Sequence, residues 1–362
     1  MSMKKAVFLA TAALSLVACG KTYLDEPVAQ NSIGFNTWAN NLTKARAQGS
    51  NEFTNGDDFA VYGYKSMSDN TGANTVFDGV TVSTTDGTTW TYDTPRFWDS
   101  NYDKYTFFAV SPASAVASAN AQTGEITSTS FTFEGNNNDI LVADKKEVAK
   151  GDGSTFFNGF ATVPLQFNHV ASLVDIKIKK APAFHSATVS VTAFKLSNIK
   201  NEGTFSVNDA YTDNHPVATW NSEGTTDDYT PSNGVESVTL PLTIAEDSNF
   251  PSQNAAAASD IIKSLIVMPQ TFVASDGTDP QKITLNYKIA VGDESIEYND
   301  KNLYLADFDV VDDADQNDTK IGSWEPGKHY TLYITIGANA ISFSASISNW
   351  TPADNGYHYL VK

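Results

Sequence analysis

The feature that most limits the fold of this 362-residue chain is an alternation of apolar and polar side chains with a period of two. The stretches 172–180, 237–244 and 282–290 all place apolar residues at alternate positions. Such a pattern sends one row of side chains into a core and the other into water, as in a strand of an antiparallel sheet. Helical periodicity is scarce, and only 254–265 and, more weakly, 113–121 are expected as helices. The sequence therefore predicts an all-β fold.

The clearest pair of strands lies near the C-terminus. Residues 330–336 alternate apolar with polar, residues 337–340 (Gly-Ala-Asn-Ala) read as a turn, and residues 341–347 alternate apolar residues with serines. Two alternating runs on either side of a short turn predict a β-hairpin with one face in the core.

The spacing of the strands indicates two β-sandwich domains in tandem, of the transthyretin-like, Greek-key type. Five short strands precede a Gly-rich loop at residues 149–159, and a second series of strands begins at Val163. We expect an N-terminal domain at residues 47–155 and a C-terminal domain at residues 156–362. The strands expected before the loop lie near residues 59–63, 76–82, 105–109, 131–133 and 140–143.

Composition excludes several classes of protein. With 41% hydrophobic residues, the chain has enough apolar side chain to form a core, so it is not a disordered protein. Its 42 acidic and 23 basic residues give a formal net charge of −19. A nucleic-acid partner is not expected, because binding phosphates requires a basic surface, and anionic lipid would repel the chain.

The N-terminus carries an export signal, which we assign to residues 1–18. Lys4 and Lys5 precede an apolar run from Ala6 to Ala18, which is too short to cross a bilayer. The single cysteine, Cys19, follows Leu-Val-Ala and resembles the lipidation site of a bacterial lipoprotein. We predict acylation at Cys19; the alternative is a free cysteine beside an ordinary cleavage site. A lone cysteine also leaves the fold without an internal disulfide.

No residues carry a recognisable catalytic pattern. None of the five histidines is two, three or four residues from another, and there is no nucleophile elbow, phosphate loop or dinucleotide fingerprint. The Ser-x-x-Lys match at Ser197–Lys200 lacks the companion motifs of penicillin-recognising enzymes. We therefore predict a protein that is not an enzyme, with no catalytic residues, no cofactor and no metal site.

An acidic run from Asp307 to Asp318 fits two interpretations, a calcium-binding loop and a solvated acidic loop between strands. Asp313, Asp315 and Asn317 have the first three spacings of a calcium-binding loop. Asp318 and Trp324, however, stand where such a loop has glycine and glutamate.

Aromatic residues gather in one short region. They fit two interpretations, a platform on which sugars stack or a packed core. The six residues are Trp90, Tyr92, Phe97, Trp98, Tyr102 and Tyr105.

Several segments together resemble the fimbrillin family, the type V pilins of Bacteroidales. They keep the order and spacing of the family across nearly the whole chain after residue 18. The segments are Phe59–Tyr64 (FAVYGY), Trp90–Pro112, Val163–Ile178, Leu265–Phe272 (LIVMPQTF), Trp324–Ile336 and Ile341–Pro352.

The resemblance implies a structural subunit of cell-surface fimbriae that supports adhesion. Family members are outer-membrane lipoproteins with two β-sandwich domains. In many of them an arginine-specific protease removes an N-terminal segment, and the subunits then polymerise with other pilin subunits by strand exchange.

Arg46 stands where the family pattern would put the processing site. The chain has only two arginines, Arg46 and Arg96, and Arg46 lies in a polar stretch between a candidate strand at 32–38 and the strand at 59. Residues 19–46 would then be a lipidated segment that processing removes. The alternative is an unprocessed surface arginine in a linker.

The C-terminal tail is a candidate donor strand. Tyr357, Tyr359 and Val361 alternate with His358 and Leu360, as in a segment that fills a groove with every second side chain. An ordinary last strand of its own domain explains the same pattern equally well.

A hydrolase is not expected, because the chain lacks any recognisable nucleophile or carboxylate arrangement, but another class competes with the pilin interpretation. The aromatic region would suit a surface lipoprotein that binds glycans. The start Cys19–Pro27 also resembles nutrient-binding lipoproteins, but those are largely helical.

Overall fold

The computed structural model describes residues 32–37, 45–46, 50–51, 53–133, 139–150, 162–208, 216–222, 226–229, 238–239, 259–312, 315–337 and 341–349. In this part of the chain, strands dominate and the only helical pieces are three single 3₁₀ turns, so the all-β prediction is confirmed. The turns are η1 (Ala113–Ala115), η3 (Pro182–Phe184) and η5 (Leu305–Asp307). No helix among the described residues is long and apolar enough to span a membrane.

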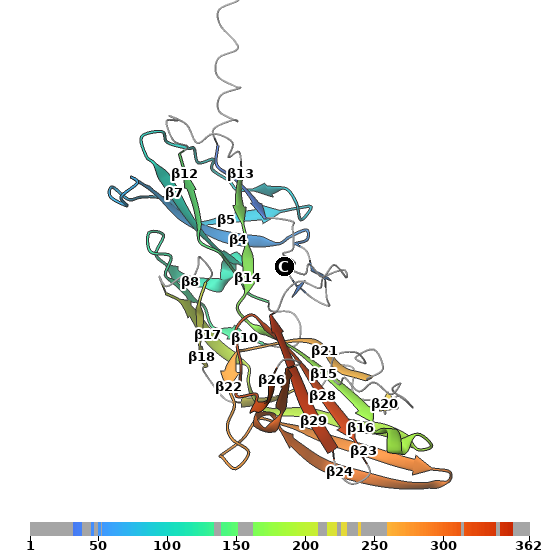
Figure 1. Cartoon of the computed structure of the whole chain (residues 1–362). Coiled ribbons are helices and arrows are strands. Elements are labelled where there is room, and N and C mark those ends of the chain that lie inside the picture. The colour runs from blue at the N-terminus through green and yellow to red at the C-terminus, as the bar shows by residue number, and fades with distance from the viewer. Residues whose placement is uncertain are drawn as a thin grey trace, which may run out of the picture.

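The N-terminal half is built on a seven-stranded sheet, in the upper part of Figure 1. The strand order is β14-β11-β7-β4-β5-β6, and β12 pairs beside β11 on the same edge of β7. The strands are β4 (Asp58–Ser66), β5 (Asn74–Thr84), β6 (Trp90–Thr91), β7 (Lys104–Ser111), β11 (Leu141–Ala143), β12 (Lys146–Ala149) and β14 (Phe167–His169).

A two-stranded parallel layer covers one face of this sheet. Strand β1 (Gly34–Thr37) pairs with β13 (Thr162–Leu165), with Phe35 opposite Val163. Side chains from both layers form one apolar core, which includes Phe35 of β1, Phe59 of β4 and Leu165 of β13. This is the first sandwich. A short ladder of β2 (Ala45–Arg46) and β3 (Ser50–Asn51) lies between β1 and β4 in the chain.

A third sheet joins the two halves of the molecule. Strand β9 from the N-terminal half pairs with β17 from the C-terminal half, so that Val207 faces Ile126. In Figure 1 this sheet lies between the upper and lower strands. Its strands are β8 (Val116–Ala119), β9 (Ile126–Ser128), β10 (Phe131–Thr132), β17 (Glu202–Val207) and β18 (Ala218–Ser222).

The C-terminal half is a sandwich of two larger sheets. One contains β21 (Ser259–Val267), β15 (Ser172–Lys180), β28 (Lys328–Ile336), β29 (Ile341–Asn349), β25 (Asp309–Asp312) and β26 (Asp315–Lys320). The other contains β19 (Thr226–Tyr229), β20 (Val238–Thr239), β16 (Thr188–Lys200), β23 (Lys282–Val291) and β24 (Glu294–Tyr304). A small ladder of β22 (Gln270–Thr271) and β27 (Ser323–Trp324) lies beside them.

The predicted C-terminal hairpin is confirmed. Strands β28 and β29 pair antiparallel, with Tyr330 opposite Ile347 and Ile336 opposite Ile341. Leu332 and Ile334 of β28 are fully buried in the core between the two sheets. The alternation in the sequence therefore corresponds to the buried face of this strand.

Both helix predictions are wrong within the described residues. Residues 113–115 form the turn η1, residues 116–119 form strand β8, and residues 259–265 belong to strand β21. Strand β21 pairs with β15 along its length, with Ile262 opposite Ile176. Intrinsic helix propensity is weak, and long-range strand pairing overrides it in these residues.

The proposed division into residues 47–155 and 156–362 stays a prediction. Strands β13 and β14 follow that division in the chain but pair with β1 and β11 of the N-terminal half. The pairing therefore favours a crossing between the halves after His169, where β15 begins the C-terminal sandwich.

Candidate functional site: the N-terminal strand and its groove

The candidate site is the groove of the first sandwich in which strand β1 lies. Ile33 and Phe35 point inward, with only 1% and 4% of their surfaces exposed, whereas Asn36 between Phe35 and Thr37 is exposed. Successive side chains of a strand point to opposite faces, so this strand buries one face in the core and exposes the other. We call residues 32–37 the leader strand.

The side chain of Phe35 occupies the centre of an aromatic pocket. Its ring lies 5.2 Å from the ring of Phe77, 5.8 Å from Phe107, 5.9 Å from Tyr92 and 6.2 Å from Phe59, measured between centroids. Three of these four contacts are edge-to-face, the arrangement that aromatic rings prefer. The four partner rings come from β4, β5, β7 and the segment after β6. One side chain of the leader strand therefore contacts three strands of the sheet.

Hydrogen bonds hold the backbone of the leader strand along both edges. Strand β13 pairs with it on one side. On the other side, the Ile33 N–H donates to the carbonyl of Arg96 at 2.7 Å, and the Tyr92 hydroxyl donates to the carbonyl of Ile33 at 2.5 Å. Ser32 also forms an isolated antiparallel bridge with Phe97.

The end of the leader strand is held differently, through a side chain. The indole N–H of Trp90 donates to the hydroxyl of Thr37 at 3.2 Å. This contact depends on a hydrogen-bond acceptor at position 37, whereas the contacts at Ile33 involve only main-chain atoms of the strand.

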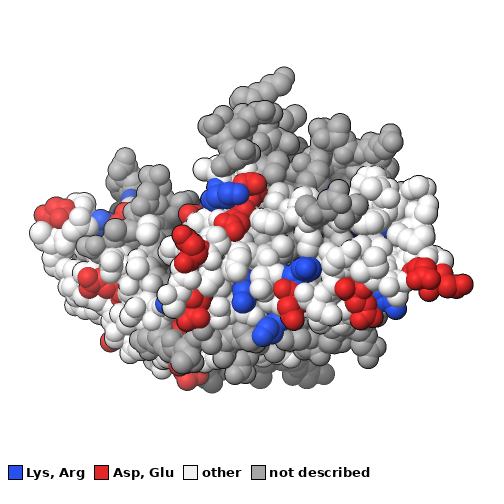
Figure 2. All heavy atoms as spheres, turned by 90° about the horizontal axis from the view of Figure 1, so that it is seen from below, with Lys and Arg blue, Asp and Glu red and all other residues white. Residues whose placement is uncertain are grey.

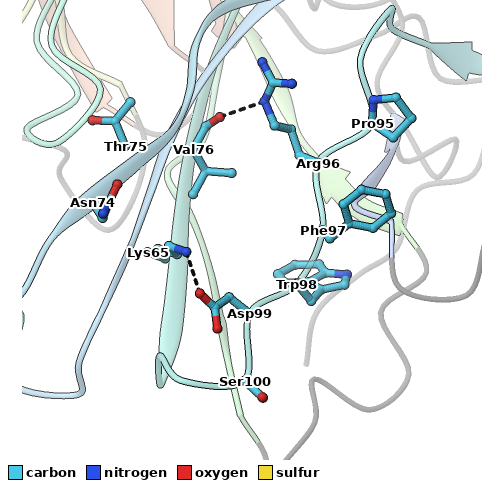
Figure 3. Close-up of a pocket in the computed structure, with 10 residues that line it drawn as sticks. All are labelled: Lys65, Asn74, Thr75, Val76, Pro95, Arg96, Phe97, Trp98, Asp99 and Ser100. Atoms are coloured by element: carbon cyan, nitrogen blue, oxygen red, sulfur yellow. Dashed lines mark hydrogen bonds and ion pairs between the residues drawn. The ribbon is translucent and has the colours of Figure 1, made fainter. Parts of the chain in front are cut away.

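A loop at residues 95–100 forms the outer wall beside the strand. Figure 3 shows how it faces β4 and β5 across a hollow of about 600 Å³. Two polar contacts cross that hollow: Arg96 Nε donates to the carbonyl of Val76 at 3.1 Å, and Lys65 Nζ lies 2.7 Å from Asp99 Oδ2. The guanidinium of Arg96 also lies over the ring of Phe77.

The protease candidate Arg46 lies in strand β2, opposite Ser50 of β3. Its side chain is outside the described residues. Cys19 and the tail residues Tyr357, Tyr359 and Val361 also lie outside the described part of the chain, so lipidation, cleavage and strand donation stay predictions.

The aromatic region is mainly packing. Trp90 and Tyr105 are buried, Trp98 packs edge-on against Tyr105 at 4.7 Å, and Tyr92 contacts the leader strand. Phe97 alone of the six has a largely exposed ring, at 45%. The packing interpretation is therefore confirmed for Trp90, Tyr92, Trp98 and Tyr105.

Two weaker chemical motifs, the Ser-x-x-Lys match and the acidic run, can be followed in part among the described residues. Ser197 is buried, and the ammonium of Lys200 donates to the hydroxyl of Ser222 at 2.9 Å. Most of the acidic run lies in β25 and β26, which pair antiparallel, and the side chains at 311–318 lie outside the described residues. Among the described side chains, no three of His, Cys, Asp and Glu are grouped to hold a metal.

Charges are interspersed on the face shown in Figure 2. Basic groups lie among acidic ones in a mostly uncharged surface. This face presents no basic stripe of the kind that binds a phosphate backbone.

The sequence predicts a candidate strand at residues 32–38, but it does not predict the loop that holds this strand. The Trp-x-Tyr pattern at residues 90–92 was a usable signal, since both side chains donate hydrogen bonds to the leader strand. The contact from the carbonyl of Arg96 could not be predicted from the sequence, because a main-chain contact does not depend on the identity of the side chain.

Fold and groove together define a two-sandwich protein whose first sandwich is completed by a strand from the N-terminal end. The model of the fimbrillin-like family matches residues 43–350, and the chain belongs to this family. A search of curated proteins finds no match.

Solved structures of fimbrial proteins are similar to this chain, and the first of them, with a TM-score above 0.5, shares its fold. A fimbrial protein from Bacteroides vulgatus ATCC 8482 is 18% identical, with 88% of this chain and 99% of that chain covered and a TM-score of 0.55. A fimbrilin from Porphyromonas gingivalis W83 is 12% identical, with 91% and 100% covered and a TM-score of 0.40.

Replacing Phe35 with alanine should loosen the leader strand. Truncating a buried phenylalanine typically costs about 3–5 kcal/mol, and here it removes four ring contacts at once. We expect faster hydrogen exchange of the β1 amides and a lower urea midpoint. Asn36→Ala, on the exposed face of the same strand, is the control and should change neither. Unaltered protection of β1 in Phe35→Ala would show that the pocket does not hold the strand.

Proposed function

We propose that this chain is a structural subunit of cell-surface fimbriae that is exported as an outer-membrane lipoprotein and polymerises by protease-triggered strand exchange. Membership of the fimbrillin-like family supports the fimbrial role and argues for a structural protein over an enzyme. The observation that carries the mechanism is the leader strand, which fills an aromatic groove with only two large side chains, Ile33 and Phe35.

The physical basis of exchange is the state of the groove without its leader strand. Removing β1 exposes the rings of Phe59, Phe77 and Phe107 and leaves strand β13 without its parallel partner. An exposed apolar floor beside an unpaired strand edge is a template for another extended segment. While the chain is intact, the leader strand is present at high effective concentration and an incoming strand competes poorly.

Cleavage after Arg46 would end that advantage. The other arginine, Arg96, is half-buried, its guanidinium is bound to the carbonyls of Val76 and Thr94, and its main chain holds the leader strand. A protease needs an extended, accessible backbone, so the geometry around Arg96 disfavours cutting there. The family match also begins at residue 43, after the leader strand.

The donor in this proposal is the tail Tyr357–Lys362 of a second subunit. Its alternation supplies Tyr357, Tyr359 and Val361 on one face, in the spacing that Ile33 and Phe35 have on the leader strand. The test is the assembly state of the purified chain before and after an arginine-specific protease acts.

The lipid anchor makes a separate prediction. Acyl chains contribute about 0.8 kcal/mol per buried CH₂, so two or more of them hold a protein on a membrane. Cys19→Ser should abolish labelling by a fatty-acid analogue in the producing bacterium and move the protein off the membrane. Replacing the neighbouring Gly20 with serine is the control. Unchanged labelling of Cys19→Ser would refute acylation at this residue.

A further inference from the structure

The segment from Tyr92 to Asp99, which we call the clasp, is braced from the core by two tyrosine hydroxyls. Tyr105, fully buried on β7, accepts a hydrogen bond from the Asp99 N–H at 2.6 Å. Tyr92 accepts one from the Arg96 N–H at 3.2 Å. Burial raises the pKa of both hydroxyls, that of Tyr105 to about 12, so both keep their protons at neutral pH.

The clasp is also fixed from the side of the sheet. Arg96 donates a hydrogen bond to the carbonyl of Val76, and Asp99 forms an ion pair with Lys65. These two contacts lie at opposite ends of the hollow in Figure 3. Four contacts from β4, β5, β7 and Tyr92 therefore set the path of a short loop without regular structure. Such preorganisation lowers the cost of ordering the loop when a strand binds to it.

The hydrogen bonds from the clasp to Ile33 reach main-chain atoms, while the ring of Tyr92 also packs against Phe35 at 5.9 Å between centroids. The carbonyl of Arg96 accepts from the Ile33 N–H, the Tyr92 hydroxyl donates to the Ile33 carbonyl, and Phe97 bridges Ser32 through the backbone. Every extended segment offers the same N–H and C=O groups at these positions. The clasp therefore recognises a strand by its backbone, in contrast to Trp90, which recognises the side chain of Thr37.

We propose that the clasp holds the backbone of whichever strand occupies the groove, first the leader strand and then a donor strand from a second copy of the chain, and that Tyr92 is its positioning residue. The part of this inference that concerns the donor strand rests on the proposed function, whereas the part that concerns the leader strand does not. The hydroxyl of Tyr92 then sets how long the leader strand stays after cleavage and how firmly the donor strand is held in the fibre.

The first test uses the uncut full chain and needs no assembly. Tyr92→Phe removes the hydroxyl, leaves the Ile33 carbonyl without this donor and takes the acceptor from the Arg96 N–H. Hydrogen exchange at Ile33 and the following β1 amides should speed up by about tenfold, the effect expected of one buried hydrogen bond. Tyr330→Phe is the matched control, because that buried hydroxyl also accepts one N–H, from Glu325, but in the other half of the molecule.

The second test follows release after cleavage. The full chain carries a maleimide dye on Cys19, its only cysteine, and fluorescence anisotropy reports departure of the labelled fragment after an arginine-specific cut. Tyr92→Phe should shorten the half-life about tenfold and should also make assembled fibres dissociate faster. Thr37→Val, which removes only the acceptor for Trp90, should speed release of the leader strand and leave fibres unchanged.

The outcomes distinguish the clasp from the proposed function in fibre assembly. Equal exchange rates in Tyr92→Phe and Tyr330→Phe would overturn the clasp, whether or not the protein assembles. Fibres of Tyr92→Phe as durable as those of the wild type would overturn its role for the second occupant. Faster β1 exchange in a protein that never assembles would uphold the clasp for the leader strand and refute the proposed function.

Discussion

Arg46→Ala is expected to stay monomeric in the presence of an arginine-specific protease, under conditions in which the wild-type chain forms fibres. The substitution leaves residues 32–37 tethered to the sandwich that they complete, so the leader strand rebinds faster than a second chain can displace it. Folding should be untouched, because Arg46 lies in a two-residue ladder that is separate from the sheets of the sandwiches. Size-exclusion chromatography and electron microscopy measure the loss of assembly.

The control for this variant is Lys44→Ala, which changes a neighbouring charge and keeps the arginine. It should be cut and should assemble like the wild type. Fibres formed by Arg46→Ala under the protease would show that cleavage at this residue is not the trigger.

Deletion of Tyr357–Lys362 is expected to abolish self-assembly while leaving a folded chain that the protease still cuts. The deleted residues supply the proposed donor side chains, Tyr357, Tyr359 and Val361. The groove of the truncated chain is intact, so it should still accept the tail of an untruncated copy. Mixed with the wild type, the truncated chain should therefore end up at one end of each fibre and shorten the fibres in proportion to its amount.

Removal of Lys362 alone is the matched control, since it keeps all three donor side chains. Polymerisation of the truncated chain at the wild-type rate would place the donor elsewhere. No effect on fibre length in the mixture would mean that its groove does not take part.

Strands were predictable from the sequence where the alternation is strong. In the hairpin of β28 and β29 the alternation correctly marks Leu332 and Ile334 as buried, although Tyr333 of the other row is buried as well. The helices predicted at 113–121 and, within the described residues, at 259–265 failed because helix propensity is only a local preference. Strand β21 instead follows from its partner β15, about ninety residues earlier in the chain.

Pairings between distant segments were beyond the reach of pattern reasoning. The parallel pair of β1 and β13 joins residues 34–37 to 162–165, and β9 pairs with β17 across the two halves. Alternation tells which face of a strand is buried but not which strand lies beside it. The same limit applies to the site: Ile33 and Phe35 could be predicted as an inward face, whereas the main-chain contacts from Arg96 and the hydroxyl of Tyr92 could not.

The most direct measurement of the central claim is a disulfide trap between the groove and the tail of a second copy. Thr162 is exposed on β13 and lies opposite Gly34, so a donor strand in the place of β1 would bring His358 or Leu360 beside it. Neighbouring strands lie about 4.8 Å apart, within the range that a disulfide bridges. Thr162→Cys combined with His358→Cys, or with Leu360→Cys, in a Cys19→Ser background covers both directions of the donor strand.

We predict a ladder of disulfide-linked oligomers on a non-reducing gel for one of the two pairs, and only after cleavage at Arg46. Fibres that assemble after cleavage without a cross-link from either pair would contradict the account, as would a ladder from the uncut chain.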